Sequence, residues 1–341
     1  MNIAETLCEF KAAKINFEVK TENDTLLPNY KGSTFRGVFG HIFKDVMCFT
    51  FDSVCETCNF QAVCMFKKIF DSPPSSNSTR LKNYSSLPHP YIIEAPLESK
   101  NFYKTNETIK FSLVLIGQAV SLFPYFAYSF GLAGKKGIGK MRNGKFILCN
   151  IINDKNKQKL YNPNKEELIS LTEYYTINDF ISKKTDNESK LTVCLDFITP
   201  TKIIFNEKIV QRLEFHIFIR NILRRISNLN FFHCITQAPA NNENNYCNNN
   251  NKNVKNNNDI NFNYFIEKAY NVKGKNNLMW RSVDRYSNRQ KSHMKISGFI
   301  GEVLFEDVPL EFLWIIKLGE LIHVGKNTTF GNGKYIIKSI I

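Results

Sequence analysis

Apolar and polar residues alternate along short segments of the chain, as they do in β-strands with one buried face. The first half of the chain holds predicted strands at residues 14–20, 91–95, 108–116 and 145–151. Apolar residues at helical spacing predict helices over 30–47 and 121–130. The resulting order is strand, helix, strand, strand, helix, strand, which is typical of a ferredoxin-like domain.

The second half repeats this order. Strands are predicted at 191–198, 278–286, 295–305 and 335–340, and helices at 208–228 and 310–322. We therefore predict an α+β protein of tandem ferredoxin-like (RRM-like) domains. The domains would span residues 1–152 and 191–341, with a polar linker over 153–190.

An asparagine-rich segment interrupts the second predicted domain. Residues 241–260 contain 12 asparagines in 20 positions, which is too polar a composition to bury. We predict a disordered insertion there.

The charged residues of the chain indicate which kind of partner it binds. Lys and Arg together number 45 against 31 Asp and Glu, so the net charge is +14, which favours a polyanion. Nucleic acid is the leading candidate and an anionic membrane surface the weaker one. No apolar run reaches the roughly 20 residues of a membrane span, and the N-terminus does not have the pattern of a signal peptide. The expected location is the cytoplasm.

Four of the nine cysteines cluster in one segment. Cys55 and Cys58 have the two-residue spacing of a chelating pair, and Cys64 with Cys48 could complete a tetrahedral thiolate site for zinc or an iron-sulfur cluster. Such a site would be structural. The alternative is that the cysteines are reduced and metal-free, with Cys48 part of the core.

Glycine and lysine are concentrated near the C-terminus, in residues 323–335, and a similar segment occupies 131–140. Backbone without side chains, flanked by positive charge, suits contact with phosphates. The order of a Walker nucleotide site is absent, so the expected ligand is a polynucleotide. The candidate RNA contacts in these segments are Lys135, Lys136, Lys140, Gly325, Lys326, Gly331, Gly333 and Lys334. Valine at Gly331 or Gly333 is expected to weaken RNA binding and leave the fold intact.

A second basic segment is interleaved with aromatic residues. Arg281, Arg285, Arg289 and Lys291 surround Trp280 and Tyr286. Arginines for phosphates beside rings for bases are typical of RNA recognition. The alternative is a strand pair with an exposed basic turn.

Taken together, the C-terminal run, residues 285–291 and the trio Cys55, Cys58 and Cys64 resemble one family. This family comprises the CRISPR-associated endoribonucleases of the RAMP superfamily that process precursor RNA. The similarity extends from residue 35 to the last strand. The resemblance implies two tandem ferredoxin-like domains and metal-independent cleavage of CRISPR repeat RNA, with no required cofactor. Two alternatives are a non-catalytic RNA-binding subunit of a CRISPR effector complex and a zinc-dependent regulator, which the cysteines alone support.

Two histidines are candidates for the chemistry. The apolar stripe of the first long helix leaves His41 and Lys44 on the opposite face, where a base and a positive charge could act on an RNA phosphate. The resemblance supports His41, because family members commonly carry a catalytic histidine near this helix. The alternative is a surface histidine paired with Asp45. His323, directly before the C-terminal glycines, either touches RNA or caps the last helix.

Overall fold

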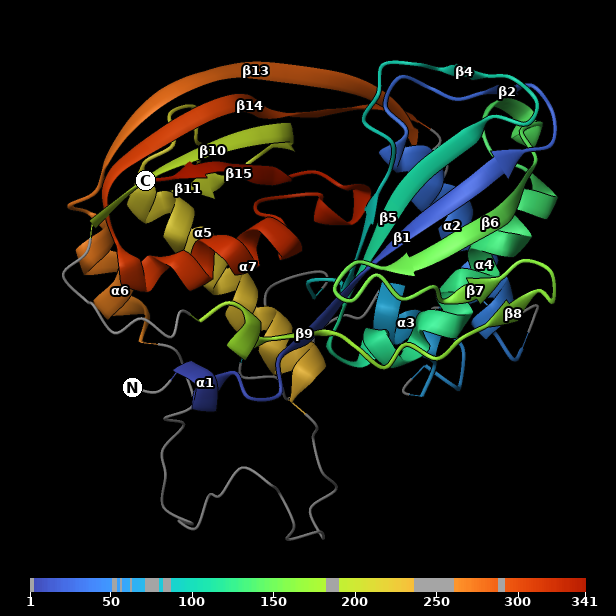
Figure 1. Ribbon diagram of the computed structural model, residues 1–341, viewed down its shortest axis with the longest axis horizontal. Helices are drawn as coiled ribbons and strands as arrows, with labels where there is room; N and C mark the ends of the chain where they lie inside the picture. Colours follow the sequence, from blue (N-terminus) through green and yellow to red (C-terminus); the bar gives the residue numbers. More distant parts are fainter. Residues whose placement is uncertain are drawn as a thin grey trace, which may run out of the picture.

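A computed structural model describes residues 3–341 apart from 51–53, 56, 62, 71–79, 82–86, 182–189, 236–260 and 288–291. The asparagine-rich segment therefore lies outside the described residues. Figure 1 shows two α+β lobes side by side, with the early chain in one and the late chain in the other.

The first lobe is built on an antiparallel sheet in the order β3-β5-β1-β6. Its strands are β1 (Lys11–Thr21), β3 (Tyr91–Glu94), β5 (Thr108–Ile116) and β6 (Phe146–Asn153). Two helices, α2 (Gly32–Met47) and α4 (Phe123–Lys136), cover one face of this sheet. Alternate β1 residues from Ala13 to Val19 are buried beneath them, as the period of two in a strand requires.

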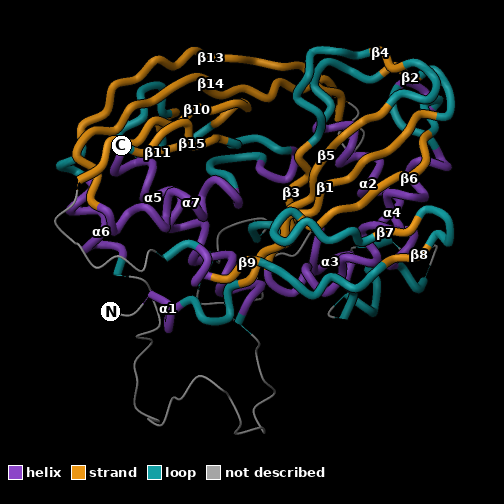
Figure 2. The backbone as a smooth tube through the Cα atoms, in the orientation of Figure 1, coloured by secondary structure: helices purple, strands orange, loops and turns teal. Residues whose placement is uncertain are grey.

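The second lobe repeats the arrangement. Its sheet has the order β13-β14-β10-β15. The tube in Figure 2 shows β13 and β14 arching over the long helices of this lobe, α5 and α7. The elements are β10 (Lys190–Thr201), α5 (Phe215–Leu229), β13 (Lys273–Ser287), β14 (Ser292–Pro309), α7 (Leu313–Ile322) and β15 (Tyr335–Ile340). Numbered within each half, both sheets have the strand order 2-3-1-4. The predicted tandem ferredoxin-like fold is confirmed.

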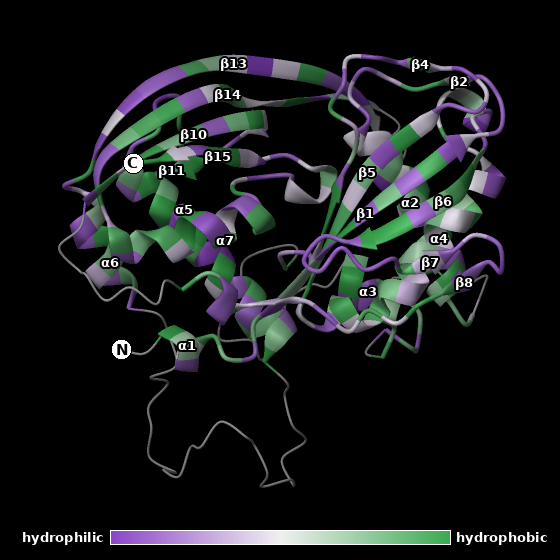
Figure 3. Ribbon diagram, in the orientation of Figure 1, coloured by the Kyte–Doolittle hydropathy of each residue, from purple (hydrophilic) through white to green (hydrophobic). Residues whose placement is uncertain are grey.

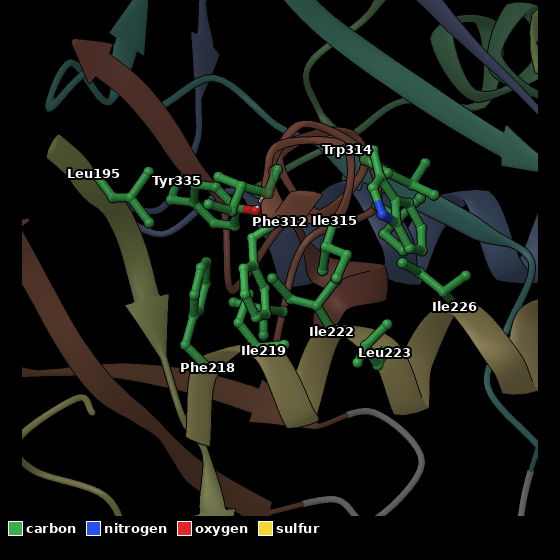
Figure 4. Close-up of a cluster of buried hydrophobic side chains, with 14 of the residues drawn as sticks. Leu195, Phe218, Ile219, Ile222, Leu223, Ile226, Phe312, Trp314, Ile315 and Tyr335 are labelled. Carbon is green, nitrogen blue, oxygen red and sulfur yellow. Dashed lines mark hydrogen bonds between the residues drawn. The ribbon is translucent and has the colours of Figure 1, made fainter. Parts of the chain in front are cut away.

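Apolar residues from the helices and the sheet fill the second core. In Figure 4, Phe218 and Ile222 of α5 and Ile315 of α7 point toward one another and toward Tyr335 of β15. All four are fully buried. Figure 3 shows the same separation along the chain: apolar positions (green) gather where helices meet sheets, and the loop with β2 and β4 is hydrophilic.

Shorter elements complete the fold. They are α1 (Ile3–Thr6), β2 (Thr25–Leu26), α3 (Met65–Phe70), β4 (Phe102–Tyr103), β7 (Tyr161–Asn162), β8 (Glu167–Leu168), β9 (Tyr175–Thr176), β11 (Ile204–Phe205), β12 (Lys208–Ile209) and α6 (Phe262–Ala269). The short 3-10 and π turns are Gly117–Leu122, Lys140–Arg142, Ile177–Asp179, Asn230–Cys234, Leu310–Phe312 and Thr328–Phe330.

One predicted helix begins later than expected. Residues 208–214 do not continue α5, because Asn206 and Glu207 adopt positive φ and turn the chain into the β11–β12 hairpin. Helix α6 was not predicted. It directly follows the asparagine-rich segment and has only 8 residues, so its periodicity is short.

The buried core of the second lobe extends to residues of the first. Leu7 and Phe10 of the N-terminal segment, with Ile92 and Ile116 of the first sheet, belong to the buried cluster of the second lobe. Helix α1 accordingly lies beneath the second lobe in Figure 1. Among the described helices, none has the length and apolar character needed to cross a membrane.

Candidate nucleic-acid interface

The glycine-rich loop, defined here as residues 323–334, lies at the seam between the two lobes (Figure 1). The Tyr30 hydroxyl is 3.1 Å from the carbonyl oxygen of Phe330 and donates to Oδ1 of Asn332 at 2.8 Å. A Cβ added at Gly331 would lie 2.9 Å from the carbonyl oxygen of Ile93. The loop is therefore packed against the first lobe.

This packing corrects the expectation for valine at Gly331 and Gly333. Both residues are buried and have positive φ, of 81° and 71°. A Cβ at Gly333 would lie 1.7 Å from the carbonyl oxygen of Val324. A side chain cannot fit there with the loop unchanged, so an intact fold is not expected.

His323 is a buried link between the lobes. Its exposed fraction is 0%, Nε2 lies 2.9 Å from Oε1 of Glu94, and Nδ1 lies 3.0 Å from the carbonyl oxygen of Asn332. Burial lowers the pKa of His323, while the contact with Glu94 opposes that shift. With both ring nitrogens engaged inside the protein, His323 cannot reach RNA in this structure. Its catalytic role stays a prediction, and in this structure the ring links the two lobes.

The carboxylate of Glu94 contacts positively charged side chains from both lobes. Its Oε2 is 2.7 Å from Nζ of Lys334 and 3.1 Å from Nζ of Lys14. Burial alone would raise the pKa of Glu94, but the hydrogen bond and charge of His323, with the charges of both lysines, hold it well below its usual value. Lys334, predicted as an RNA contact, is thus engaged with a carboxylate of the other lobe.

Two hollows flank the glycine-rich loop, and Phe330 lines both. The first, called the hairpin hollow, has a volume of about 450 Å³ and is bounded by residues 28–32, 94–97, 198–200 and 281–284. The second, called the helix hollow, has a volume of about 380 Å³ and lies between α2, α5, residues 87–89 and the loop. Both lie at the seam, where a chain crossing from one lobe to the other could bind.

The helix hollow is strongly basic. Its charged side chains are Arg36, Lys202, Arg224, Arg225 and Lys326, and His89 also lines it. No Asp or Glu is among its described lining residues. Such an excess of positive charge favours an anion.

Two of these arginines keep free donors. Arg225 donates through Nε to the carbonyl oxygen of Ile322 at 2.8 Å, while its Nη2 and Nε of Arg36 have no hydrogen-bond partner among the described residues. Burial lowers the pKa of Arg225 to about 10, so it remains charged at neutral pH. Buried donors of this kind are costly unless a ligand satisfies them.

Phe330 separates two guanidinium groups. The Cζ atoms of Arg36 and Arg285 lie 4.8 Å and 4.7 Å from the centre of its ring. Arg281 is exposed and lines the hairpin hollow. Two members of the predicted basic segment, Arg289 and Lys291, lie outside the described residues. The structure thus brings Arg281 and Arg285 to the seam together with Gly325 and Lys326.

The first-helix candidates lie elsewhere on α2. His41 is exposed, and Lys44 lines a small hollow among the cysteines, so neither lines the two seam hollows. Asp45, the alternative partner of His41, instead pairs with Nζ of Lys136 at 2.9 Å.

The other predicted contacts of residues 131–140 lie at the end of α4 and just after it. Lys135 and Lys136 are exposed, and Lys140 begins a 3-10 turn. Neither Lys135 nor Lys136 lines the two seam hollows.

The four predicted metal ligands line one hollow of about 20 Å³. Thr50 lies between two of them, with its Oγ1 at 3.7 Å from Sγ of Cys48 and 3.9 Å from Sγ of Cys58. Within the described ranges, no group of three or more His, Cys, Asp or Glu residues is arranged to hold a metal ion. The structure therefore gives no support to the zinc or iron-sulfur site at Cys48, Cys55, Cys58 and Cys64.

Comparison with family models identifies both halves of the chain. A model named for an AF_1859 N-terminal domain matches residues 10–173, and the model of the CRISPR-associated endoribonuclease Cas6 matches residues 195–335. The second half of the chain is thus similar to Cas6 endoribonucleases. Its glycine-rich loop lies within the second matched range.

Solved Cas6 structures have the same fold at low sequence identity. A Cas6 product complex has a TM-score of 0.53 and 11% identity, covering 96% of this chain and 99% of that chain. The Cas6 of Thermus thermophilus has a TM-score of 0.50 and 12% identity, covering 96% and 98%.

Longer chains match as well. A chain of a partial Cas6-RT-Cas1–Cas2 complex has a TM-score of 0.54 and 12% identity, and 96% of the present chain covers 46% of it. In a second structure of such a complex the covered share is 29%. The chain thus spans less than half of these proteins. No curated protein matches it.

The residues that sequence reasoning missed are Arg36, His89 and Arg225. They come from three separate segments, and only the folded chain brings them to one hollow. The only signal for Arg36 in the sequence was its position in Phe35-Arg36-Gly37, at the start of the first long helix.

Proposed function

We propose that this protein binds CRISPR repeat RNA at the seam between its lobes and cleaves it to produce guide RNAs. The observation that carries the proposal is the basic, acid-free lining of the helix hollow beside the glycine-rich loop. The guanidinium groups of Arg36 and Arg225, which line this hollow, would bind an RNA phosphate. The hairpin hollow, with Arg281, would hold neighbouring nucleotides.

The proposed reaction requires no metal ion. The ribose 2′-hydroxyl attacks its own phosphodiester, which leaves a 2′,3′-cyclic phosphate and a 5′-hydroxyl. This route needs a base for the 2′-hydroxyl, an acid for the leaving oxygen, and positive charge for the pentavalent phosphate. The arginines of the helix hollow would supply the charge.

His41 stays our proposed base or acid of a metal-free cleavage, because it is exposed on α2 beside Gly37, whose added Cβ would meet open space. The His41→Ala variant should then cleave roughly 10² to 10⁴ times more slowly under single-turnover conditions. RNA affinity should hardly change, because the basic side chains of the helix hollow remain to bind the phosphates. Unchanged cleavage would remove His41 from the mechanism. Lys44 is proposed as a supporting charge.

A second prediction follows from the net charge of +14. The affinity for repeat RNA should fall steeply with salt, with a log-log slope of about −0.7 per neutralised phosphate of a single strand. Titrations at several salt concentrations measure the slope. Lys326→Ala should make it shallower by about one phosphate. A flat plot would contradict an electrostatic RNA surface.

The function itself is tested by incubating the protein with repeat RNA in EDTA. A site-specific product with a 5′-hydroxyl and a cyclic phosphate is the expected result. Tight binding without product would favour the alternative, a non-catalytic RNA-binding subunit of a CRISPR complex. The Cas6-RT-Cas1–Cas2 chains that share this fold are themselves parts of larger assemblies.

A further inference from the structure

His89 is the histidine that lines the helix hollow. It precedes β3, and its ring packs between two aromatic rings, with centroid distances of 6.5 Å to Phe70 and 5.9 Å to Tyr91. A neutral imidazole has one ring nitrogen that can accept a proton.

Three other described histidines are engaged inside the protein. His216 is 3.0 Å from a carboxylate oxygen of Glu214 and stacks on Tyr270, and Nε2 of His233 is 2.6 Å from the carbonyl oxygen of Pro88. His323 bridges Glu94 and Asn332. His89 differs from all three because it is only half buried and borders the basic hollow.

The surroundings keep the His89 ring neutral. Burial lowers its pKa to about 4, helped by the positive charges of Arg36 on α2 and Arg225 on α5 and by nearby His233. Tyr91 of β3 also faces the ring. At neutral pH the imidazole therefore has a lone pair available. A bound phosphate would offset the charges of the two arginines and raise the proton affinity of the ring.

We propose that His89 is the general base of the cleavage reaction, an inference that rests on the proposed function. Arg36 and Arg225 hold the scissile phosphate in the helix hollow, and His89 accepts the proton of the ribose 2′-hydroxyl. The O2′–phosphorus bond forms and the phosphorus–O5′ bond breaks, with no oxidation or reduction. The leaving O5′ takes its proton from solvent. His89 then returns its proton to solvent.

The test compares two substitutions at His89 with a matched histidine elsewhere. His89→Gln removes the base, and His89→Phe does so while keeping an aromatic ring between Phe70 and Tyr91. Both should slow single-turnover cleavage by roughly 10² to 10⁴. Their affinity for repeat RNA and their thermal unfolding should stay close to those of the wild type. His216→Gln, at the other end of α5 from the hollow, should cleave at the wild-type rate.

Chemical rescue separates a catalytic role from a structural one. Cleavage by His89→Ala should recover in part when free imidazole is added, whereas imidazole should not accelerate the wild type. If His89→Gln and His89→Phe cleave normally while the wild type is active, the inference is wrong and the proposed function stands. If all His89 variants are inactive and imidazole restores none of them, the ring is structural and the inference is also wrong. A wild type that binds repeat RNA without cutting it overturns both proposals.

Discussion

Adding one methyl group at Gly333 is expected to destabilise the protein by roughly 2 to 5 kcal/mol. The backbone of Gly333 has a φ of 71°, a conformation that costs an L-residue about 1 to 2 kcal/mol. The new Cβ would also lie 1.7 Å from the carbonyl oxygen of Val324, so the backbone of the loop must move. Chemical denaturation of Gly333→Ala against the wild type measures the loss.

The chain supplies a matched control for this substitution. Gly37 lies inside α2, has no positive φ, and has open space where a Cβ would be added. Gly37→Ala should stabilise the protein by about 0.5 to 1 kcal/mol, because glycine costs that much inside a helix. Equal unfolding midpoints for Gly333→Ala and the wild type would show that the loop does not hold the close contact described here.

The second large effect is expected at Glu94. Its side chain is 5% exposed and interacts with His323, Lys334 and Lys14. Replacement by glutamine removes the negative charge and leaves the positive groups unpaired. Breaking a buried charge pair costs about 3 to 5 kcal/mol, and the partial exposure of the two lysines reduces this to roughly 3 kcal/mol. Glu94→Gln should therefore unfold at clearly lower denaturant concentration.

The pH dependence of stability provides a further readout. The pKa of Glu94 is held well below its ordinary value of 4.5, so the unfolded chain binds this proton more readily than the folded one. The stabilisation is complete above pH 4.5 and is lost as the pH falls through the folded pKa. Glu94→Gln should lack this component of acid sensitivity.

An exposed ion pair serves as the control for Glu94. Glu302 pairs with Lys338 at the surface, and their side chains are 43% and 45% exposed. Glu302→Gln should change the free energy of unfolding by less than about 1 kcal/mol. If Glu94→Gln is as mild as Glu302→Gln, the buried network contributes little to joining the lobes.

The amphipathic pattern of the sequence was sufficient for the fold. Strand β5 occurs at the predicted residues, and β15 matches its prediction as well, because alternation with period two fixes which face of a strand is buried. Where the pattern failed, at residues 208–214, two positive-φ residues turned a segment that reads as helix into a hairpin. Local conformation overrode periodicity there.

The interface was only partly predictable. The sequence predicted a basic, RNA-binding protein with a glycine-rich loop, and two of its candidate contacts, Lys326 and Arg285, lie at the seam. It could not show that Gly331 packs against Ile93 of the first lobe and Gly333 against Val324, because glycine serves close backbone approach to protein as well as to phosphate. Likewise, the sequence position of His323 did not reveal its partner Glu94, which lies 229 residues earlier. The role of His41 stays a prediction.

The sequence by itself determined the two repeated domains, the positive charge and the family resemblance, since each of these depends on composition or on short-range periodicity. Only the tertiary structure decided which charges are available to a ligand. Arg36, His89 and Arg225 are far apart in the chain and meet in the helix hollow. Lys334 and His323 are instead bound to Glu94. The availability of a side chain depends on what the distant parts of the chain place beside it, and periodicity carries no information about that.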